Sequence, residues 1–436
     1  MRTSLLHGRT GLAAVCTVVA CAAAVSAGAT AQAATAQAST SLKTTVMQQQ
    51  LPSVQALVAS DPARYAGFWV DQTGRIAHVE ATDSTVVPTT VASSLPAMAG
   101  IKAMSTTPAT TAAFKIEIDP VKYSGTKLAA IQAEVPSNAA FKAALVKAGA
   151  NWSEVGLNPV RNQVEIDVTK ITPALTAAAK AQFGAAAYLA VEAVPAEAIA
   201  QVPAKQVSAF LARTARPQHA HVVSPQNRGT TGGSDYAPWY GGDLTAYEYN
   251  SKYYFCTLGY EFEDYSMSTA GHCGSTSQGF FQWTDGAYQG QTFSTQFGNN
   301  RIDLKKLDNS TYSPYVWNSA TNSIPVNGYE AAYVFQTVCV DGAITGQKCG
   351  EVTKVNVTIN DTTNQGTATT NFQDQINGSS TLCQGGDSGG PAYDQTYAGG
   401  GEARAVGTIT AEDPNVCFIN DMNQITYIFH DGPKAA

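Results

Sequence analysis

Residues 383–391 read CQGGDSGGP, and the core of this stretch is GDSGGP at 386–391. A serine hydroxyl is a weak nucleophile until a neighbouring base takes its proton, so Ser388 needs a partner from another part of the chain. The glycines allow a tight turn that brings backbone N–H groups towards a reacting carbonyl. We therefore expect the N–H groups of Gly386 and Ser388 to form an oxyanion hole. Asp387 is adjacent to the serine and is expected to pair with a buried charge and so fix the loop.

The stretch STAGHC at residues 268–273 supplies the base that Ser388 requires. A glycine-rich surface turn with an incidental serine would explain residues 383–391 alone, but it leaves this second motif unexplained. Together the two motifs resemble those of the chymotrypsin-like serine peptidases, in which His, Asp and Ser follow in that order along the chain. The resemblance implies that His272 is the general base, that Ser388 is the nucleophile, and that an aspartate lies between them in the sequence.

Three aspartates between the two motifs are candidates for the third member. Asp303 follows a polar turn at residues 299–301 and opens a short strand-like run that ends at Leu307. Asp285 lies in TDG and Asp308 in DNS, and both tripeptides are typical of turns. We therefore choose Asp303 and keep the other two as alternatives.

Four further stretches narrow the resemblance to the streptogrisin and α-lytic branch of secreted bacterial peptidases. They are YGGD at 240–243, CTLGY at 256–260, YSPYVW at 312–317 and VCVDGAITGQKCG at 338–350. The resemblance implies an all-β catalytic domain with the chymotrypsin-like double six-stranded antiparallel β-barrel and no metal or organic cofactor. Lys305 and Lys306 depart from the branch, which has small and apolar residues there, and the loop from Cys383 to Ser388 is one residue shorter.

The residue pattern of the C-terminal half independently favours an all-β fold. From residue 240 onward, short apolar or alternating runs are separated by turn clusters, as at residues 331–340, 350–359 and 405–409. Such spacing predicts a barrel or a sandwich.

The chain has 8 cysteines, of which Cys16 and Cys21 lie near the N-terminus. The six others all lie in the C-terminal half and allow fifteen pairings, and the absence of a close Cys-x-x-Cys pair disfavours metal-bound thiols. The family resemblance selects the disulfides Cys256–Cys273, Cys339–Cys349 and Cys383–Cys417. Disulfides imply an oxidising compartment.

Residues 1–33 are interpreted as a secretory signal peptide. Arg2 and Arg9 provide the positive start, residues 11–25 form an apolar run, and AQA at 31–33 offers a cleavage site, with AQA at 36–38 as a second choice. A membrane anchor is the alternative, but the run is shorter than the roughly 20 residues that a spanning helix needs. We expect a secreted protein that keeps no membrane association once the signal is removed.

Residues 34–212 are predicted to form a small α+β pro-region. Hairpin-like patterns at residues 65–79 and 152–168 flank a helix-like segment at residues 141–148. We expect His78, His219 and His221 to be ordinary solvated side chains.

Residues 213–239 have the composition of an exposed linker, and we place the activating cleavage there, between Arg216 and Tyr240. The peptidase domain then covers residues 240–436. The resemblance implies that the pro-region assists folding and afterwards inhibits the enzyme.

The charge distribution supports contact between the two halves. From residue 229 onward there are 8 Lys+Arg and 21 Asp+Glu, a net charge of −13, while the remainder carries +6, so that the 436 residues total −7. Opposite charges steer surfaces together. Charged residues make up only 14% of the chain and form no basic stripe, which disfavours nucleic-acid binding. We expect protein or peptide substrates and a monomeric enzyme.

The stretch AVGTITAE at residues 405–412 resembles the strand that lines the primary specificity pocket of the branch. The alignment places Thr410 beside the Asp303 carboxylate, Ala411 and Glu412 in a pocket wall, and the apolar Leu382 near the base. An inward Glu412 would favour Lys or Arg before the scissile bond. The alternative is that Glu412 begins a solvated loop and leaves a chymotrypsin-like apolar pocket.

The sequence thus predicts a secreted serine endopeptidase that acts through an acyl-enzyme and is synthesised as a zymogen. Two other functions use the same motifs: a catalytically inactive homologue that acts as a binding module, and an esterase that keeps the Ser-His-Asp triad.

Overall fold

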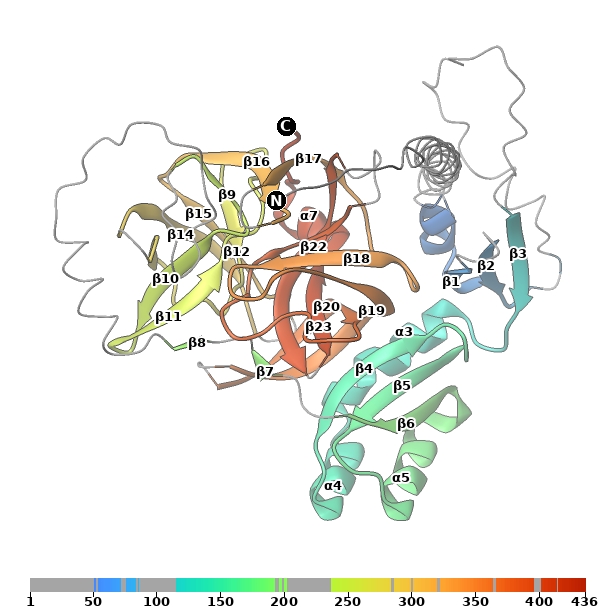
Figure 1. The fold of residues 1–436 in the computed structure, drawn as a ribbon. Helices are drawn as coiled ribbons and strands as arrows, with labels where there is room; N and C mark the ends of the chain where they lie inside the picture. Colours follow the sequence, from blue (N-terminus) through green and yellow to red (C-terminus); the bar gives the residue numbers. More distant parts are fainter. Residues whose placement is uncertain are drawn as a thin grey trace, which may run out of the picture.

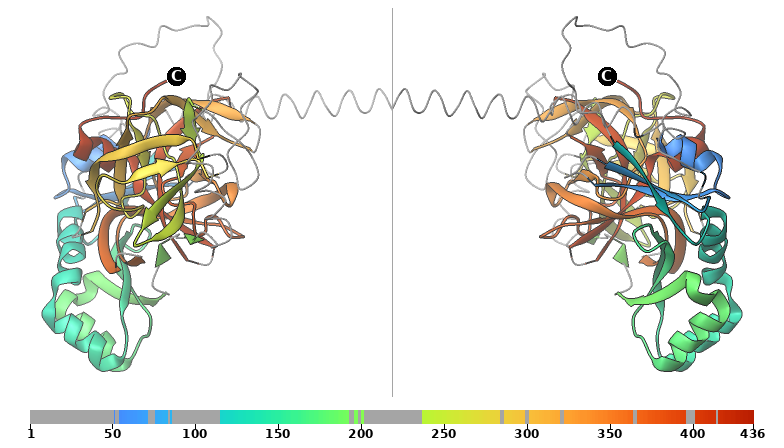
Figure 2. Two further views of the ribbon diagram at one scale, coloured as in Figure 1. Left: turned by 90° about the vertical axis from the view of Figure 1, so that its left-hand side faces the viewer. Right: turned by 90° about the vertical axis from the view of Figure 1, so that its right-hand side faces the viewer.

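The computed structural model describes residues 51, 54–71, 76–83, 85, 115–192, 196–197, 200–201, 237–283, 286–298, 301–319, 322–363, 366–395, 401–413 and 415–436. The predicted signal peptide, most of the linker and Asp285 lie outside these residues. Two β-barrels built from residues 237–436 lie side by side, and a lobe of helices and strands formed by residues 115–192 extends from the second barrel (Figure 1). Figure 2 shows this teal and green lobe from two further sides.

Six antiparallel strands form the first barrel, in the order β12-β15-β14-β13-β10-β11. The chain beyond β11 closes the ring against β12, because Gly259 N–H donates to Ser268 O at 2.7 Å and Ser268 N–H donates to Tyr260 O at 2.9 Å. The strands are β10 (Leu244–Tyr249), β11 (Lys252–Thr257), β12 (Met267–Thr269), β13 (Gly279–Phe281), β14 (Tyr288–Gln296) and β15 (Leu304–Asp308).

Six antiparallel strands also form the second barrel, and their pairings make a closed ring in the order β18-β19-β20-β23-β22-β21 and back to β18. The strands are β18 (Thr337–Gly342), β19 (Gly346–Thr363), β20 (Gly366–Asn377), β21 (Pro391–Asp394), β22 (Ala403–Asp413) and β23 (Val416–Asp421). The predicted all-β class with two six-stranded antiparallel barrels is therefore confirmed.

Three strands and one helix lie outside the two rings: β9 (Trp239–Gly241), β16 (Tyr312–Trp317), β17 (Ser323–Tyr329) and α7 (Met422–Phe429). Between the barrels lies a cluster of buried apolar side chains to which both contribute, such as Ile302 and Leu304 from the first and Tyr393 and Ala405 from the second. Each barrel also has a core of its own, and the buried strand β23 has no exposed residue. The site described below lies at the junction that this shared core holds together.

Residues 115–192 combine three helices with a three-stranded sheet. The helices are α3 (Gly125–Glu134), α4 (Ala139–Ala148) and α5 (Pro173–Phe183), and the sheet strands are β4 (Trp152–Asn158), β5 (Gln163–Val168) and β6 (Ala187–Val191). The helix starts are set by side-chain caps: Asn138 accepts a hydrogen bond from Phe141 N, and Thr172 accepts one from Leu175 N just before a proline. One face of the sheet and the helices share a single apolar core.

The first strand of residues 115–192, β3 (Lys115–Pro120), belongs instead to a second small sheet with β1 (Tyr65–Asp71) and β2 (Ile76–Ala81). The single turns η1 (Val135–Ser137) and η2 (Gly184–Ala186) complete the lobe, and β7 (Ala196–Glu197) and β8 (Ala200–Gln201) follow it along the chain.

The lobe is joined to the second barrel through a continuous sheet. Strand β4 pairs antiparallel with β19, with Val155 opposite Thr358 and Glu154 opposite Ile359. This pairing covers an edge that would otherwise expose unpaired backbone groups.

A largely buried lysine reinforces the same junction. The ammonium group of Lys354 on β19 lies 2.7 Å from Asp167, 3.2 Å from Glu154, 3.2 Å from Glu165 and 3.7 Å from Glu192. Burial opposes the charge on Lys354, but the four carboxylates raise its pKa above the ordinary value. Burial raises the pKa of Asp167 to about 7 and that of Glu154 well above its usual range.

Several local predictions are confirmed and two are wrong. The hairpins at residues 65–79 and 152–168 are β1–β2 and β4–β5, and residues 141–148 lie in α4. In the predicted run 331–340 only residues from Thr337 onward form a strand. His78 is not simply solvated, because its ring stacks on Trp69 at 3.8 Å between centroids and lies 3.1 Å from an Asp119 oxygen. Among the described residues no helix is long and apolar enough to cross a bilayer.

The Lys354 cluster yields a stability prediction. Lys354→Met leaves buried carboxylates without their cation, which costs about 3–5 kcal/mol. We expect a loss of that size at pH 8 in the free energy of opening of the β4–β19 pair, measured by amide hydrogen exchange. At pH 5 the loss is smaller, because protonation of Glu154 and Asp167 removes the need for a cation. Lys348→Met, an exposed position on the same strand, is the control. Equal effects of the two substitutions would contradict this role.

Candidate active site

His272 and Asp303 form a buried hydrogen-bonded pair. His272 lies in the turn after β12, and Asp303 immediately precedes β15, so the antiparallel pairing of Thr269 with Lys305 brings the two together. The His272 Nδ1 atom lies 2.6 Å from Asp303 Oδ2, and the His272 backbone N–H donates to Asp303 Oδ1 at 2.8 Å. Both side chains are 0% exposed. Asp308, by contrast, lies at the far end of β15.

Two residues of the second barrel complete the surroundings of Asp303. The Thr410 hydroxyl donates to Asp303 Oδ2, as the alignment indicated. Asn420 brackets the backbone of Asp303: its Oδ1 accepts from Asp303 N at 2.8 Å and its Nδ2 donates to Asp303 O at 2.8 Å. The sequence analysis missed Asn420, because no motif surrounds it and only the barrel junction brings it near.

The loop that carries Ser388 is tied to both barrels. Thr257 N–H, at the end of β11, donates to Ser388 O at 2.8 Å, and Gly389 N–H donates to Ile409 O on β22 at 2.8 Å. Gly389 has a φ of 91°, and a Cβ atom there would lie 2.4 Å from Thr257 O. Only glycine fits this position, so the motif reflects a close approach of backbones. Gly386 also has a positive φ, 99°.

The predicted partner of Asp387 is wrong. Within the described residues Asp387 does not pair with a cation. Its carboxylate accepts backbone hydrogen bonds from Ile344 at 2.8 Å, Thr345 at 3.0 Å and Gln384 at 2.9 Å, together with the Thr345 hydroxyl. Burial raises the pKa of Asp387 and these donors oppose the rise. The acid therefore fixes the loop through neutral donors.

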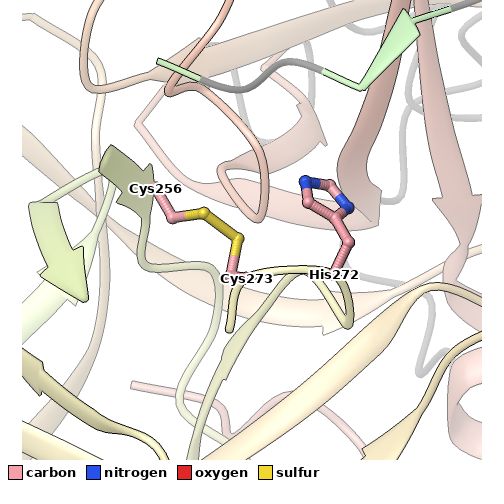
Figure 3. A group of neighbouring side chains, drawn as sticks. All are labelled: Cys256, His272 and Cys273. Atoms are coloured by element: carbon pink, nitrogen blue, oxygen red, sulfur yellow. A yellow bond between two sulfur atoms is a disulfide. The ribbon is translucent and has the colours of Figure 1, made fainter. Parts of the chain in front are cut away.

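Three disulfides join Cys256 to Cys273, Cys339 to Cys349, and Cys383 to Cys417. Figure 3 shows that the first lies directly beside His272, on the turn that carries the ring. The two sulfurs are bonded to each other, so this group of side chains offers no thiolate to a metal.

The four expected pocket residues lie in different surroundings. Thr410 and Ala411 are buried on β22, and Leu382 packs into the apolar core of the second barrel with Val352 and Ile376. Glu412 is half-buried, and its carboxylate accepts a hydrogen bond from Gly385 N–H. Burial and the nearby Asp387 raise the pKa of Glu412 to about 7.

Some known proteins are similar to part of this chain. No family model matches the chain. Streptogrisin-C from Streptomyces griseus is 31% identical over 143 residues, which cover 32% of this chain and 28% of the length of that protein. The chain is similar to the chymotrypsin-like serine peptidases of the streptogrisin and α-lytic branch.

Solved structures of this type also match. The crystal structure of Cellulomonas bogoriensis chymotrypsin has 23% identity and a TM-score of 0.36, covering 45% of this chain and 98% of that one. An α-lytic protease homologue, N4, has 20% identity and a TM-score of 0.35, covering 44% and 97%.

Lys305 and Lys306, the departures from the branch, both have defined partners. Lys305 is 1% exposed, and its ammonium group donates to Cys273 O at 2.8 Å and Gly274 O at 2.7 Å, bracing the turn that carries His272. Lys306 pairs with Asp264 at 2.7 Å and Asp431 at 2.5 Å. Burial lowers the pKa of Lys305 to about 7 although Asp303 opposes this.

The lowered pKa of Lys305 sets a pH dependence. Between pH 7 and 10 the unfolded chain binds a proton that the folded chain has released, so folding stability rises with pH in this window. Lys305→Met removes this titrating group. We expect the free energy of unfolding of the wild-type chain, relative to that of the variant, to grow as pH rises, by at most about 1.4 kcal/mol per pH unit. Unfolding midpoints in a Ser388→Ala background measure it. Lys252→Met, at an exposed position, is the control. A stability difference between wild type and Lys305→Met that stays constant with pH would contradict a lowered pKa of Lys305.

Proposed function

We propose that this chain is a secreted serine endopeptidase, synthesised as a zymogen. The observation that carries the proposal is the 2.6 Å contact between His272 and Asp303 beside the loop of Ser388. The three disulfides and the signal-like N-terminus support secretion. The chain spans about 28% of the length of streptogrisin-C, so the activity rests on the site itself.

In this mechanism His272 takes the proton of Ser388 as the hydroxyl attacks the scissile carbonyl, and it returns the proton to the leaving amine. Asp303 holds the imidazole in one tautomer and stabilises its cation, while Thr410 and Asn420 hold Asp303. The N–H groups of Gly386 and Ser388 stabilise the tetrahedral oxyanion. Water then hydrolyses the acyl-enzyme with His272 as the base.

In the same proposal residues 34–212 are a pro-region that assists folding and then inhibits, residues 213–239 are the linker with the activating cleavage, and residues 240–436 are the peptidase domain. The β4–β19 pairing and the Lys354 cluster support tight docking of this region. Barrels built from distant strand pairings fold slowly, so a docked template is useful.

A fluorophosphonate probe tests the proposed chemistry. Mature wild-type protein should be labelled at Ser388 and should digest casein. Asp303→Asn should fold normally and lower turnover by about 10⁴, because the imidazole settles in the wrong tautomer. Asp308→Asn is the matched control and should retain activity. A folded protein that is not labelled would support a binding module instead. Hydrolysis of short-chain esters without casein digestion would support an esterase.

Glu412 sets a second prediction, on specificity. Its carboxylate accepts a hydrogen bond from Gly385 N–H, three residues before Ser388. We therefore expect the substrate residue before the scissile bond to meet a negative charge. Matched peptides should be cleaved faster with Lys than Met there, and more slowly with Glu than Gln.

Because Glu412 is ionised at pH 8 and largely protonated at pH 6, both preferences should shrink at the lower pH and in Glu412→Ala. Values of kcat/KM measure them. Cleavage mainly after large apolar residues, unchanged in the variant, would contradict this role.

A further inference from the structure

An apolar cavity of about 210 Å³ lies where three parts of the chain meet. Its walls come from β1 and the helical residues 54–60, from α3 and β4 of the lobe, and from the second barrel around β19. Figure 1 shows β1 next to α3 at this junction. The apolar side chains that line the cavity include Val58, Phe68, Leu128, Leu157, Tyr333 and Val355.

The cavity lies at the meeting point of separate apolar cores. Leu128 belongs to the core of the lobe, Tyr333 to a small cluster that Phe68 joins, and Val355 packs against the core of the second barrel. Side chains that face a void lose dispersion contacts on that side, and an apolar molecule of matching size would supply them. An apolar cavity of about 150 Å³ can hold benzene, so this one has room for a somewhat larger molecule.

Glu80 on β2 gives the cavity a polar group. Its side chain is 3% exposed and lines the cavity, and it lies opposite Gly67 in the pairing of β1 with β2. A Cβ atom at Gly67 would lie 3.5 Å from Glu80 Oε2. The chain neighbours of Gly67 apart, no other atom of the described residues lies within 4 Å of that position. The space beside the carboxyl is therefore open to an atom of a ligand.

The Glu80 carboxyl is a hydrogen-bond donor at neutral pH. Burial raises its pKa to about 8, the charge of Asp119 on the neighbouring strand β3 adds to the rise, and a hydrogen bond with the Asn162 side chain opposes it. Asp119 itself lies 3.1 Å from the His78 ring. A protonated carboxyl carries one O–H donor, which a carbonyl oxygen can accept.

We propose that this cavity binds a small apolar molecule with one carbonyl group, held by the Glu80 carboxyl and the surrounding apolar side chains. Ala59 and Asn356, which also line the cavity, are exposed, so the molecule can enter from solvent. Because the walls belong to three parts of the chain, the site is complete only while these parts are in contact. A bound molecule therefore stabilises that contact by mass action. The inference does not depend on the proposed peptidase activity.

Two probes of the same shape test the site in the full Ser388→Ala chain. Acetophenone has a carbonyl group that only accepts hydrogen bonds, and cumene has no acceptor. Methyl NMR should show saturable binding of both, with nuclear Overhauser effects from the ligand ring to the methyl groups of Val58, Leu128 and Leu157. Acetophenone should bind about tenfold more weakly at pH 9 than at pH 6.5, because roughly nine-tenths of Glu80 is then ionised and lacks the donor. The affinity for cumene should change much less.

Three substitutions in the same background sharpen the test. Glu80→Gln keeps a donor that does not titrate, so the affinity for acetophenone should be the same at the two pH values. Gly67→Leu places a side chain in the open space beside the carboxyl and should abolish binding of both probes. Ala140→Leu adds the same bulk at an exposed position of α4, outside the cavity, and should leave binding unchanged.

The effect on the junction is measured by amide hydrogen exchange of the β4–β19 pair, because opening of this pair separates the Leu157 wall from the Val355 wall. At a concentration of acetophenone 100 times its Kd and at pH 6.5, exchange should slow about 100-fold. The Gly67→Leu chain should show no slowing. Saturable binding that leaves the exchange unchanged would overturn the stabilising role.

Three results would overturn the site itself. The first is the absence of saturable binding, or binding whose nuclear Overhauser effects lead to other side chains. The second is a set of such effects between the cavity methyl groups and another segment of the chain without any ligand, because the chain would then fill the cavity. The third is a pH dependence of acetophenone binding that persists in Glu80→Gln. Labelling of wild-type Ser388 by the fluorophosphonate probe tests the proposed function separately.

Discussion

The buried carboxylate of Asp303 is the constraint around which the junction of the two barrels is built. A carboxylate removed from water is costly unless donors surround it. Here the donors come from both barrels: the backbone and ring of His272 from the first, and the Thr410 hydroxyl from the second. Asn420 fixes the backbone of the same residue. The hydrogen bonds that the Asp303 carboxylate accepts therefore align the two barrels and, at the same time, orient the His272 imidazole.

Backbone hydrogen bonds between strands join the N-terminal residues to the two barrels. Strand β4 extends the sheet at β19, and the dipeptide strands β7 and β8 add to β22 and β11. In each case an exposed edge is covered by the chain itself. The β4–β19 pairing is reinforced by the Lys354 cluster, and β7 adds to the strand that carries Thr410.

The sequence predicted those parts of the site that depend on local backbone geometry. Ser388 and His272 stand in motifs whose glycines are required by close approaches, as at Gly389. The barrel class follows from short alternating runs, and the turn before β15 marks Asp303. These features can be identified without knowing which strands pair.

The remainder depends on contacts between distant segments, which no local pattern encodes. Asn420 lies 117 residues from its partner Asp303, and Lys305 is bound by carbonyls rather than by an acid. The partners of Asp387 are backbone N–H groups, for which no residue type is diagnostic. Strands β7 and β8 are two residues each and carry no periodic signal.

The most direct test of this account is the proton between His272 and Asp303. Proton NMR of the full Ser388→Ala chain should show an exchangeable resonance far downfield of the other imidazole protons, because a short bond to a buried carboxylate deshields it. It should be lost in Asp303→Asn and retained in Asp308→Asn. A folded chain that shows no such resonance, or one that keeps it in Asp303→Asn, would contradict the central role of this pair.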